Sequence, residues 1–196
     1  RAALAWDDVG QALTLARRAW RTERGRPLAA WALGWASWWS GDPGAAAIAL
    51  EEALEGPQLV EVCALAVLAR IHLQNGDLDV ADEHVVAAER LIAERGLEDL
   101  PELGMVSTAR GAVVAAAGSS AAAVAPLERG IRLRRLWGHP LETADALAVA
   151  APVIAQERGR RAAGALLAEA RRLVATCPDP GVVPDRLAAA TRAALP

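Results

Sequence analysis

Residue types that usually carry chemistry are few in this sequence, and their spacing brings none of them together. The three histidines, His72, His84 and His139, lack the i, i+4 or clustered spacing of a metal site. The two cysteines, Cys63 and Cys177, match no metal-ligand pattern either, and we interpret both as reduced thiols. We therefore predict no metal site and no catalytic residue among these five.

Lysine is absent, so all 21 basic residues are arginines. A P-loop needs a Lys to reach the phosphates, and a Schiff-base enzyme needs a Lys amine, so this sequence supports neither chemistry. The carboxylates occur in short runs such as Glu51-Glu52, which we interpret as solvated helix faces. The sequence thus predicts a protein that is not an enzyme and holds no cofactor.

The formal net charge of −3 is close to balance. A nucleic-acid-binding domain needs Arg and Lys gathered along one face, and no such stripe is visible. The densest basic cluster consists of Arg132, Arg134 and Arg135. It fits a solvated helix end better than an anion site. We predict that this chain does not bind nucleic acid.

The aromatic residues are unusual, because the seven Trp occur without any Phe or Tyr. Four of them, Trp31, Trp35, Trp38 and Trp39, lie within one short stretch. On a helix these four occupy an arc of about 100°. Small residues fill the neighbouring arc. An aromatic surface next to a surface of small residues suits a ligand with apolar faces.

Composition indicates which elements carry these residues. The chain of 196 residues is 54% hydrophobic, and its most abundant residue is Ala, the strongest helix former and one that is depleted in strands. No apolar run reaches the roughly 18 residues of a membrane span. No signal peptide is visible, and the opening without Met resembles a cut through a longer protein. We predict an all-α, cytoplasmic protein.

A short pattern repeats along the chain. A helix-breaking residue, usually followed by a polar one, precedes an Ala-rich stretch with small residues about five and twelve places later. We interpret each copy as the turn between two antiparallel helices that form a pair. Gly ends the first helix of the pair, and Asp or Ser caps the N-terminus of the second. The pattern begins at Asp7-Asp8, Gly41-Asp42, Gly76-Asp77, Gly118-Ser119 and, more weakly, Gly159-Arg160.

The repeat and the Pro and Gly residues between its copies predict helix boundaries. The expected helices are a stub at 1–6, then 8–24, 28–40, 43–55, 58–75, 78–95, 101–117, 120–137, 141–158, 160–176 and 183–195.

The repeat resembles the tetratricopeptide repeat. Leu33-Gly34 precedes Gly41 by the spacing of that family's Leu-Gly pair, and Ala46, Leu50, Ala53 and Pro57 fit its second helix. The resemblance implies a right-handed superhelix (solenoid) of antiparallel tetratricopeptide-like helix pairs. It implies one domain over 1–196, with about four complete pairs, a truncated first repeat and a C-terminal helix at 183–195.

Two further features point to one family within the tetratricopeptide-like proteins. The later copies of the repeat are about 40 residues apart, and the stretch from Leu166 to Leu173 runs into Cys177-Pro178. They are similar to the tetratricopeptide-like sensor region of large ATP-binding LuxR-type bacterial transcriptional regulators, of the maltose-operon-regulator type. Pro152 and Gly164 depart from the pattern and predict an irregular last pair. The resemblance implies an ATPase module before this region and a helix-turn-helix module after it.

In tetratricopeptide domains the first helix of each pair lines a concave groove. The resemblance therefore implies a groove whose wall is aromatic, with a few polar groups; counting back from Gly118 also gives Ala112, Ala115 and Ala116. The predicted ligand-binding residues are Trp31, Trp35, Trp38, Trp39, Arg70, Gln74, Met105 and Thr108. Two other interpretations stay open for the Trp residues: they fill the core, or they contact flanking domains.

Three functions follow as hypotheses. The first is a non-catalytic sensor that binds a small effector in the groove and so regulates ATPase and DNA-binding modules of the parent chain. The second is a protein–protein interaction scaffold whose groove holds a partner peptide or helix. The third, a catalytic domain, has no constellation of residues to support it. The sequence predicts no membrane partner.

Overall fold

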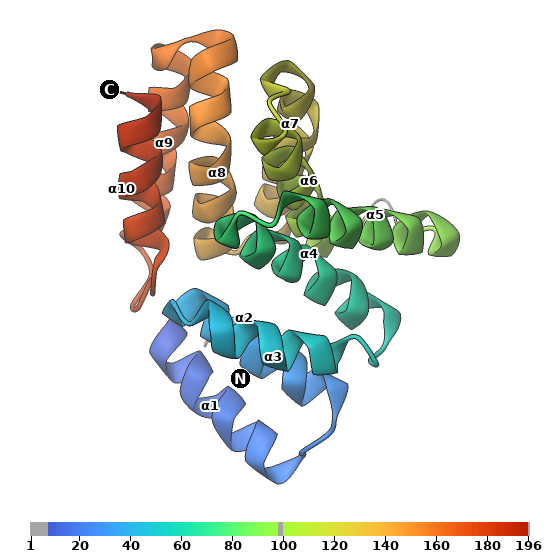
Figure 1. Cartoon of the computed structure of the whole chain (residues 1–196). Coiled ribbons are helices and arrows are strands. Elements are labelled where there is room, and N and C mark those ends of the chain that lie inside the picture. The colour runs from blue at the N-terminus through green and yellow to red at the C-terminus, as the bar shows by residue number, and fades with distance from the viewer. Residues whose placement is uncertain (1–7, 98–99, 196) are drawn as a thin grey trace. The chain divides into compact units, whose positions relative to one another are not determined.

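A computed structural model describes residues 8–97 and 100–195, and it is all-α within them. The chain divides into two compact units, Arg1–Glu98 and Asp99–Pro196, which we describe in turn (Figure 1). The prediction of a single domain over 1–196 stays a prediction, and the predicted stub at 1–6 lies outside the described residues.

Unit 1 contains α1 (Val9–Thr22), α2 (Pro27–Ser40), α3 (Pro43–Ala53), α4 (Gln58–Asn75) and α5 (Leu78–Arg95). The helices pack as the predicted pairs, α2 with α3 and α4 with α5, while α1 packs on α2. Helix α4 also contacts α2 and α3, so consecutive pairs adjoin within the unit.

Unit 2 contains a 3-10 turn η2 (Pro101–Leu103), followed by α6 (Gly104–Ala116), α7 (Ser120–Trp137), α8 (Pro140–Arg158), α9 (Arg160–Val174) and α10 (Val183–Ala194). The pairs are α6 with α7 and α8 with α9. Helix α8 is central, since it contacts α7 on one side and α9 and α10 on the other (Figure 1). Every predicted helix from 8–24 onward is present, with ends shifted by three residues or fewer.

The turns within the pairs have the predicted glycines, but only one of the three residues that follow them makes the predicted capping bond: Asp77 and Ser119 stand at the start of α5 and α7 without a side-chain capping hydrogen bond. Gly41, Gly76 and Gly118 adopt φ values of 89°, 87° and 86°, which a residue with a Cβ rarely adopts. At the first turn the Asp42 carboxylate accepts a hydrogen bond from the backbone N–H of Ala45 at 2.9 Å. Each turn reverses the chain so that the two helices of a pair lie antiparallel.

Close approach inside the pairs depends on glycine. A Cβ on Gly34 would lie 2.6 Å from Leu50 Cγ, and a Cβ on Gly111 would lie 2.4 Å from Leu127 Cγ. Both leucines are almost fully buried. The two Gly–Leu contacts have the same sequence separation and occur one in each unit. The units therefore build their helix pairs in the same way.

The last pair differs from the predicted register. Gly164 faces open space and Arg171 is exposed, whereas Ala163 and Ala170 are fully buried. The small residues thus stand one place earlier than in the other copies, because Gly159 leads straight into α9 without a capping residue between them. In α8, the first helix of this pair, the small buried position is likewise one place earlier than predicted: it is Ala151, which is fully buried, and not Pro152. Pro152 lies inside α8, which continues to Arg158.

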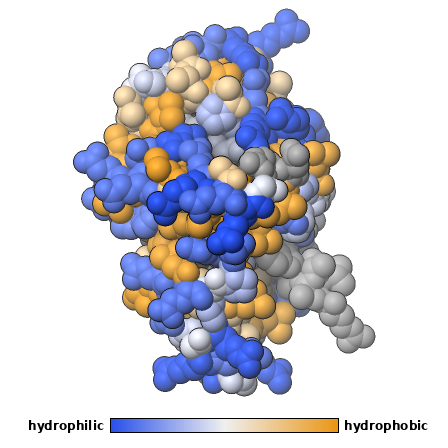
Figure 2. Space-filling view, turned by 90° about the vertical axis from the view of Figure 1, so that its right-hand side faces the viewer, coloured by the Kyte–Doolittle hydropathy of each residue, from blue (hydrophilic) through white to orange (hydrophobic). Residues whose placement is uncertain are grey.

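Among the described residues, no helix is long and apolar enough to span a membrane. On the face that Figure 2 shows, hydrophilic residues interrupt the hydrophobic ones. Large apolar side chains are nevertheless exposed at single positions, such as Leu28 and Ile48 in unit 1 and Leu136 in unit 2.

Candidate functional site

The four Trp of α2 do not form an open aromatic wall. Trp35, Trp38 and Trp39 are only 4%, 2% and 5% exposed, and Trp31 alone is half-buried. The rings of Trp35 and Trp39 pack against each other with centroids 5.7 Å apart. Small residues of α2, such as Gly34, are buried too, so the helix is covered on more than one side. Three of the four indoles are core residues, as the alternative interpretation predicts.

Arg70 and Gln74 on α4 have separate environments. The guanidinium of Arg70 lies over the indole of Trp38, 5.4 Å from the ring centroid, which is a cation–π contact. Arg70 is half-buried and joins α4 to α2. Gln74 is exposed near the end of α4. Arg70 therefore acts first as a packing residue of unit 1.

Met105 and Thr108 belong to unit 2. Met105 is half-buried, and Thr108 is 3% exposed. The Thr108 hydroxyl donates to the carbonyl oxygen of Gly104 at 2.9 Å, a bond within its own helix. A Cβ on Gly130 would meet this hydroxyl at 2.5 Å, so Thr108 marks a close contact between α6 and α7. It is not a polar group available to a ligand.

His72 and His84 are not isolated, contrary to the sequence prediction. Their ring centroids lie 5.2 Å apart, because the turn at Gly76 folds α5 back along α4 and brings positions on either side of it together. The Nδ1 atom of His72 also lies 3.6 Å from a carboxylate oxygen of Asp77. His72 stands four residues before Gly76 and His84 eight residues after it, so their unequal distances from the turn gave no signal for this pair.

Burial lowers the pKa of His84, and the neighbouring His72 lowers it further. Glu83 and Glu51 oppose this shift of the pKa. Among the described residues, no group of three or more His, Cys, Asp or Glu side chains could hold a metal ion.

The arginine cluster of α7 is divided among three environments, so one solvated helix end does not describe it. Arg134 is buried and pairs with buried Glu142 of α8 at 2.6 Å. Arg135 donates from Nε and Nη2 to both carboxylate oxygens of Glu169, at 3.0 and 2.7 Å, and this raises its pKa. Arg132 is exposed. Buried ionic groups are thus compatible with this fold where a partner helix supplies the opposite charge.

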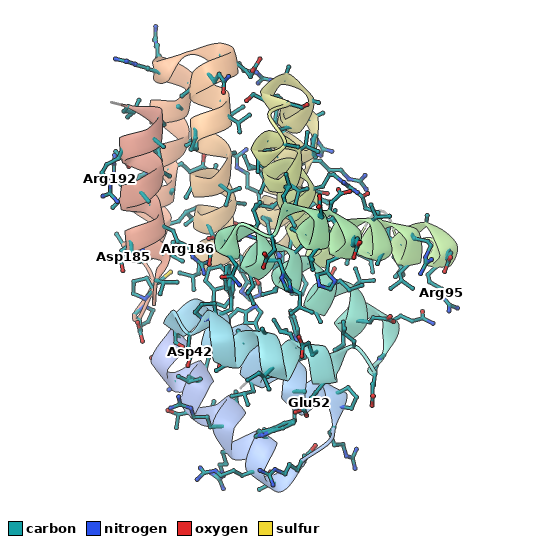
Figure 3. All side chains as sticks on the ribbon, viewed as in Figure 1. Asp42, Glu52, Arg95, Asp185, Arg186 and Arg192 are labelled. Carbon is teal, nitrogen blue, oxygen red and sulfur yellow. The ribbon has the colours of Figure 1, made fainter. Side chains whose placement is uncertain are left out.

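A third ion pair joins the C-terminal helix to α8. Arg186 donates to Asp145 at 3.0 Å, and the two side chains are 15% and 4% exposed. Figure 3 shows Arg186 on the side of α10 toward α8, whereas Arg192 on the same helix points away. Asp145 gave no signal in the sequence as a buried acid.

A hollow of about 540 Å³ opens at the end of unit 2 where α6 and α8 finish. Its walls are mostly small and apolar, and they include Ala115, Ala116 and Pro152 from the two first helices. Polar groups come from Ser120, Gln156 and Arg160, which also line it. The Ser120 hydroxyl donates to the side-chain oxygen of Gln156 at 2.8 Å.

This hollow has the volume and lining of a small-molecule site, with apolar walls and a few polar groups. Two of its residues, Ala115 and Ala116, are positions that counting back from Gly118 assigned to the groove. Its polar residues were not predicted, because two of them lie on the second helices and meet the hollow only through the fold.

No protein-family model and no curated protein matches the sequence. Among solved structures, the chain is similar to BtubC (BKLC) from P. vanneervenii, at 16% sequence identity and a TM-score of 0.58. The match covers 99% of this chain and 84% of that chain. At this identity the likeness shows the fold alone.

Proposed function

We propose that this chain is a non-catalytic sensor segment that binds a small effector, and that it belongs to a LuxR-type bacterial regulator acting in the cytoplasm. The observation that carries the effector part is the hollow at the end of α6 and α8. Its volume of about 540 Å³ lies in the usual range for ligand pockets. Its lining supplies an apolar surface and three polar side chains.

The architecture in this proposal is a right-handed solenoid of tetratricopeptide-like pairs. The support is the repetition of one packing device, Gly34 against Leu50 and Gly111 against Leu127, in both units. Solenoid pairs bury their faces against their neighbours, and repeated contacts of one kind are the sign of such stacking. A non-catalytic role is supported by the absence of Lys from the sequence and by hydroxyls such as that of Thr108, which bonds within its own helix.

The experiment is a thermal-shift screen of the chain against a panel of sugars, nucleotides and amino acids. A ligand at a hundredfold excess over its Kd stabilises a protein by about 2.7 kcal/mol, which raises the melting temperature by roughly 5–11 °C. We expect Ala116→Leu, which narrows the hollow, to abolish the shift. The matched control is Ala165→Leu at an exposed position of α9, which should leave it unchanged.

The alternative is an interaction scaffold. It is favoured by Leu28 and Ile48, which are 63% and 67% exposed on α2 and α3. If no panel member raises the melting temperature while an amphipathic peptide does, the scaffold replaces the sensor. The regulator part has its own test, since it predicts a P-loop module before this segment and a helix-turn-helix module after it in the parent protein.

A further inference from the structure

A second cleft lies between α7, α8 and α9, on unit 2 alone, and has a volume of about 390 Å³. Three arginines line it: Arg132 and Arg135 from α7 and Arg158 from α8. Apolar lining comes from all three helices, with Ile131, Ile154 and Leu166. Basic and apolar surface thus meet in one concave site.

The arginines are held in place at two edges of this cleft. Arg135 forms its bidentate pair with Glu169, and Arg158 donates from Nη1 to Glu128 at 2.5 Å. A guanidinium carries five N–H donors, so each of these arginines keeps donors that its carboxylate does not use. The ion pairs therefore orient two guanidinium groups without saturating them.

Arg132 completes the set. It stands three residues before Arg135 and four after Glu128, so all three lie on one side of α7. It is exposed, and among the described residues no carboxylate lies within ion-pair distance of it. Three arginines against the two glutamates leave the cleft with one net positive charge.

Stability does not account for this arrangement. Three of the four paired side chains are exposed and Glu169 is half-buried, at 49% and 28% for Arg135 and Glu169 and at 49% and 44% for Arg158 and Glu128. Exposed ion pairs contribute little to folding. Arg132 forms no ion pair among the described residues, and Glu128, one helical turn before it, pairs with Arg158 instead. Like charges gathered in a cleft without a gain in folding stability are typical of a site that binds an opposite charge.

We infer that this cleft binds a small amphiphilic anion. The carboxylate or phosphate group contacts Arg132 and the unused donors of Arg135 and Arg158, and the apolar body packs on Ile131 and Leu166. Guanidinium groups match both kinds of head group with paired hydrogen bonds. This site is separate from the hollow at the end of α6 and α8, so the inference goes beyond the proposed function.

The test is an NMR titration of the full chain with phenyl phosphate, benzoate and benzyl alcohol. Phenyl phosphate or benzoate should give saturable shifts of the backbone amides of residues 128–135, 154–158 and 162–166. Benzyl alcohol, which has the ring without the charge, should bind at least about tenfold more weakly. The stronger of the two anions identifies the preferred head group.

Arg132→Gln should weaken anion binding about tenfold, because it removes the charged donor that no acid occupies. Arg172→Gln is the matched control, an exposed arginine of the same unit that does not line the cleft, and it should change nothing. Both sites are exposed, so folding is little affected. Three results would overturn the inference: Kd values above about 10 mM for both anions, equal binding of benzyl alcohol, or equal losses in the two variants.

Discussion

Gly111→Ala adds one methyl group at the tightest contact between α6 and α7. The new Cβ would stand 2.4 Å from Cγ and 2.6 Å from Cδ2 of Leu127, and 3.1 Å from the backbone nitrogen of the same residue. Leu127 is 1% exposed, so its side chain cannot move out into solvent without leaving the core. Either Leu127 leaves its rotamer or the two helices move apart.

Two opposing effects set the change in the free energy of unfolding that Gly111→Ala causes. Adding a methyl group to a filled core costs about 1–3 kcal/mol. Ala in place of a mid-helix Gly returns about 0.5–1 kcal/mol through backbone entropy. Because the blocked atoms include the branch point of Leu127 rather than a flexible end, we expect the cost to dominate. The net loss should be about 1–2 kcal/mol, or roughly 2–8 °C in melting temperature.

Gly164→Ala is the matched control, since it makes the same chemical change in the helix α9 of the same unit. Apart from its chain neighbours and the backbone of its own helix, no heavy atom lies within 4 Å of the Cβ it would add. We expect this variant to be more stable by about 0.5–1 kcal/mol, from helix propensity alone. Urea unfolding followed by far-ultraviolet circular dichroism gives both free energies of unfolding.

Opposite signs for the two variants support the close-packing argument. If both variants gain stability, or both lose the same amount, the contact between Gly111 and Leu127 does not control the pair. Gly34→Ala extends the test to unit 1, where the Cβ would lie 2.6 Å from Leu50 Cγ, and it should also be destabilising.

The other predictions concern buried groups. Trp38→Ala should cost about 3–5 kcal/mol, and Trp38 emission should resist acrylamide quenching; a cost below about 1 kcal/mol would contradict its burial. Arg134→Met should destabilise by about 3–5 kcal/mol and the double variant with Glu142→Leu by much less, because only the single change takes the Arg134 cation from a buried carboxylate that stays in place. For His84 the folded-state pKa is lowered, so its contribution to stability is present above pH 6.5 and is lost as pH falls through the folded pKa. His84→Gln should flatten that part of the pH profile of unfolding.

The helices could be predicted because their limits are local. Gly at a turn with positive φ, Asp or Ser after it and Pro at a first turn act within a few residues, so each boundary was visible in the sequence. The register of the last pair was less visible. Gly159 leads directly into α9, and the buried positions moved to Ala163 and Ala170.

Side-chain partners were harder to predict, because they depend on which helices adjoin. Arg134 has the same local pattern as Arg132, yet it meets Glu142 across the turn to α8 and is buried. The pairing of His72 with His84 needed the geometry of a whole hairpin, because the two stand at unequal distances from Gly76. A charge seen in sequence therefore says little about its environment until the neighbouring helix is known.

The tryptophans show the limit of inferring a binding site from a family's geometry. Helical spacing correctly placed Trp35 and Trp39 on one side of α2, and their rings do pack together. Helical spacing determines only on which side of its helix a side chain lies. Whether that side chain is buried depends on which other helices cover it. Arg70 of α4 lies over Trp38, so the indole that was expected to face a ligand faces a protein cation instead. An exposed aromatic wall would need that position to stay uncovered. Ligand binding is therefore better sought at the unit 2 cavities, where small or charged side chains line space that no helix fills.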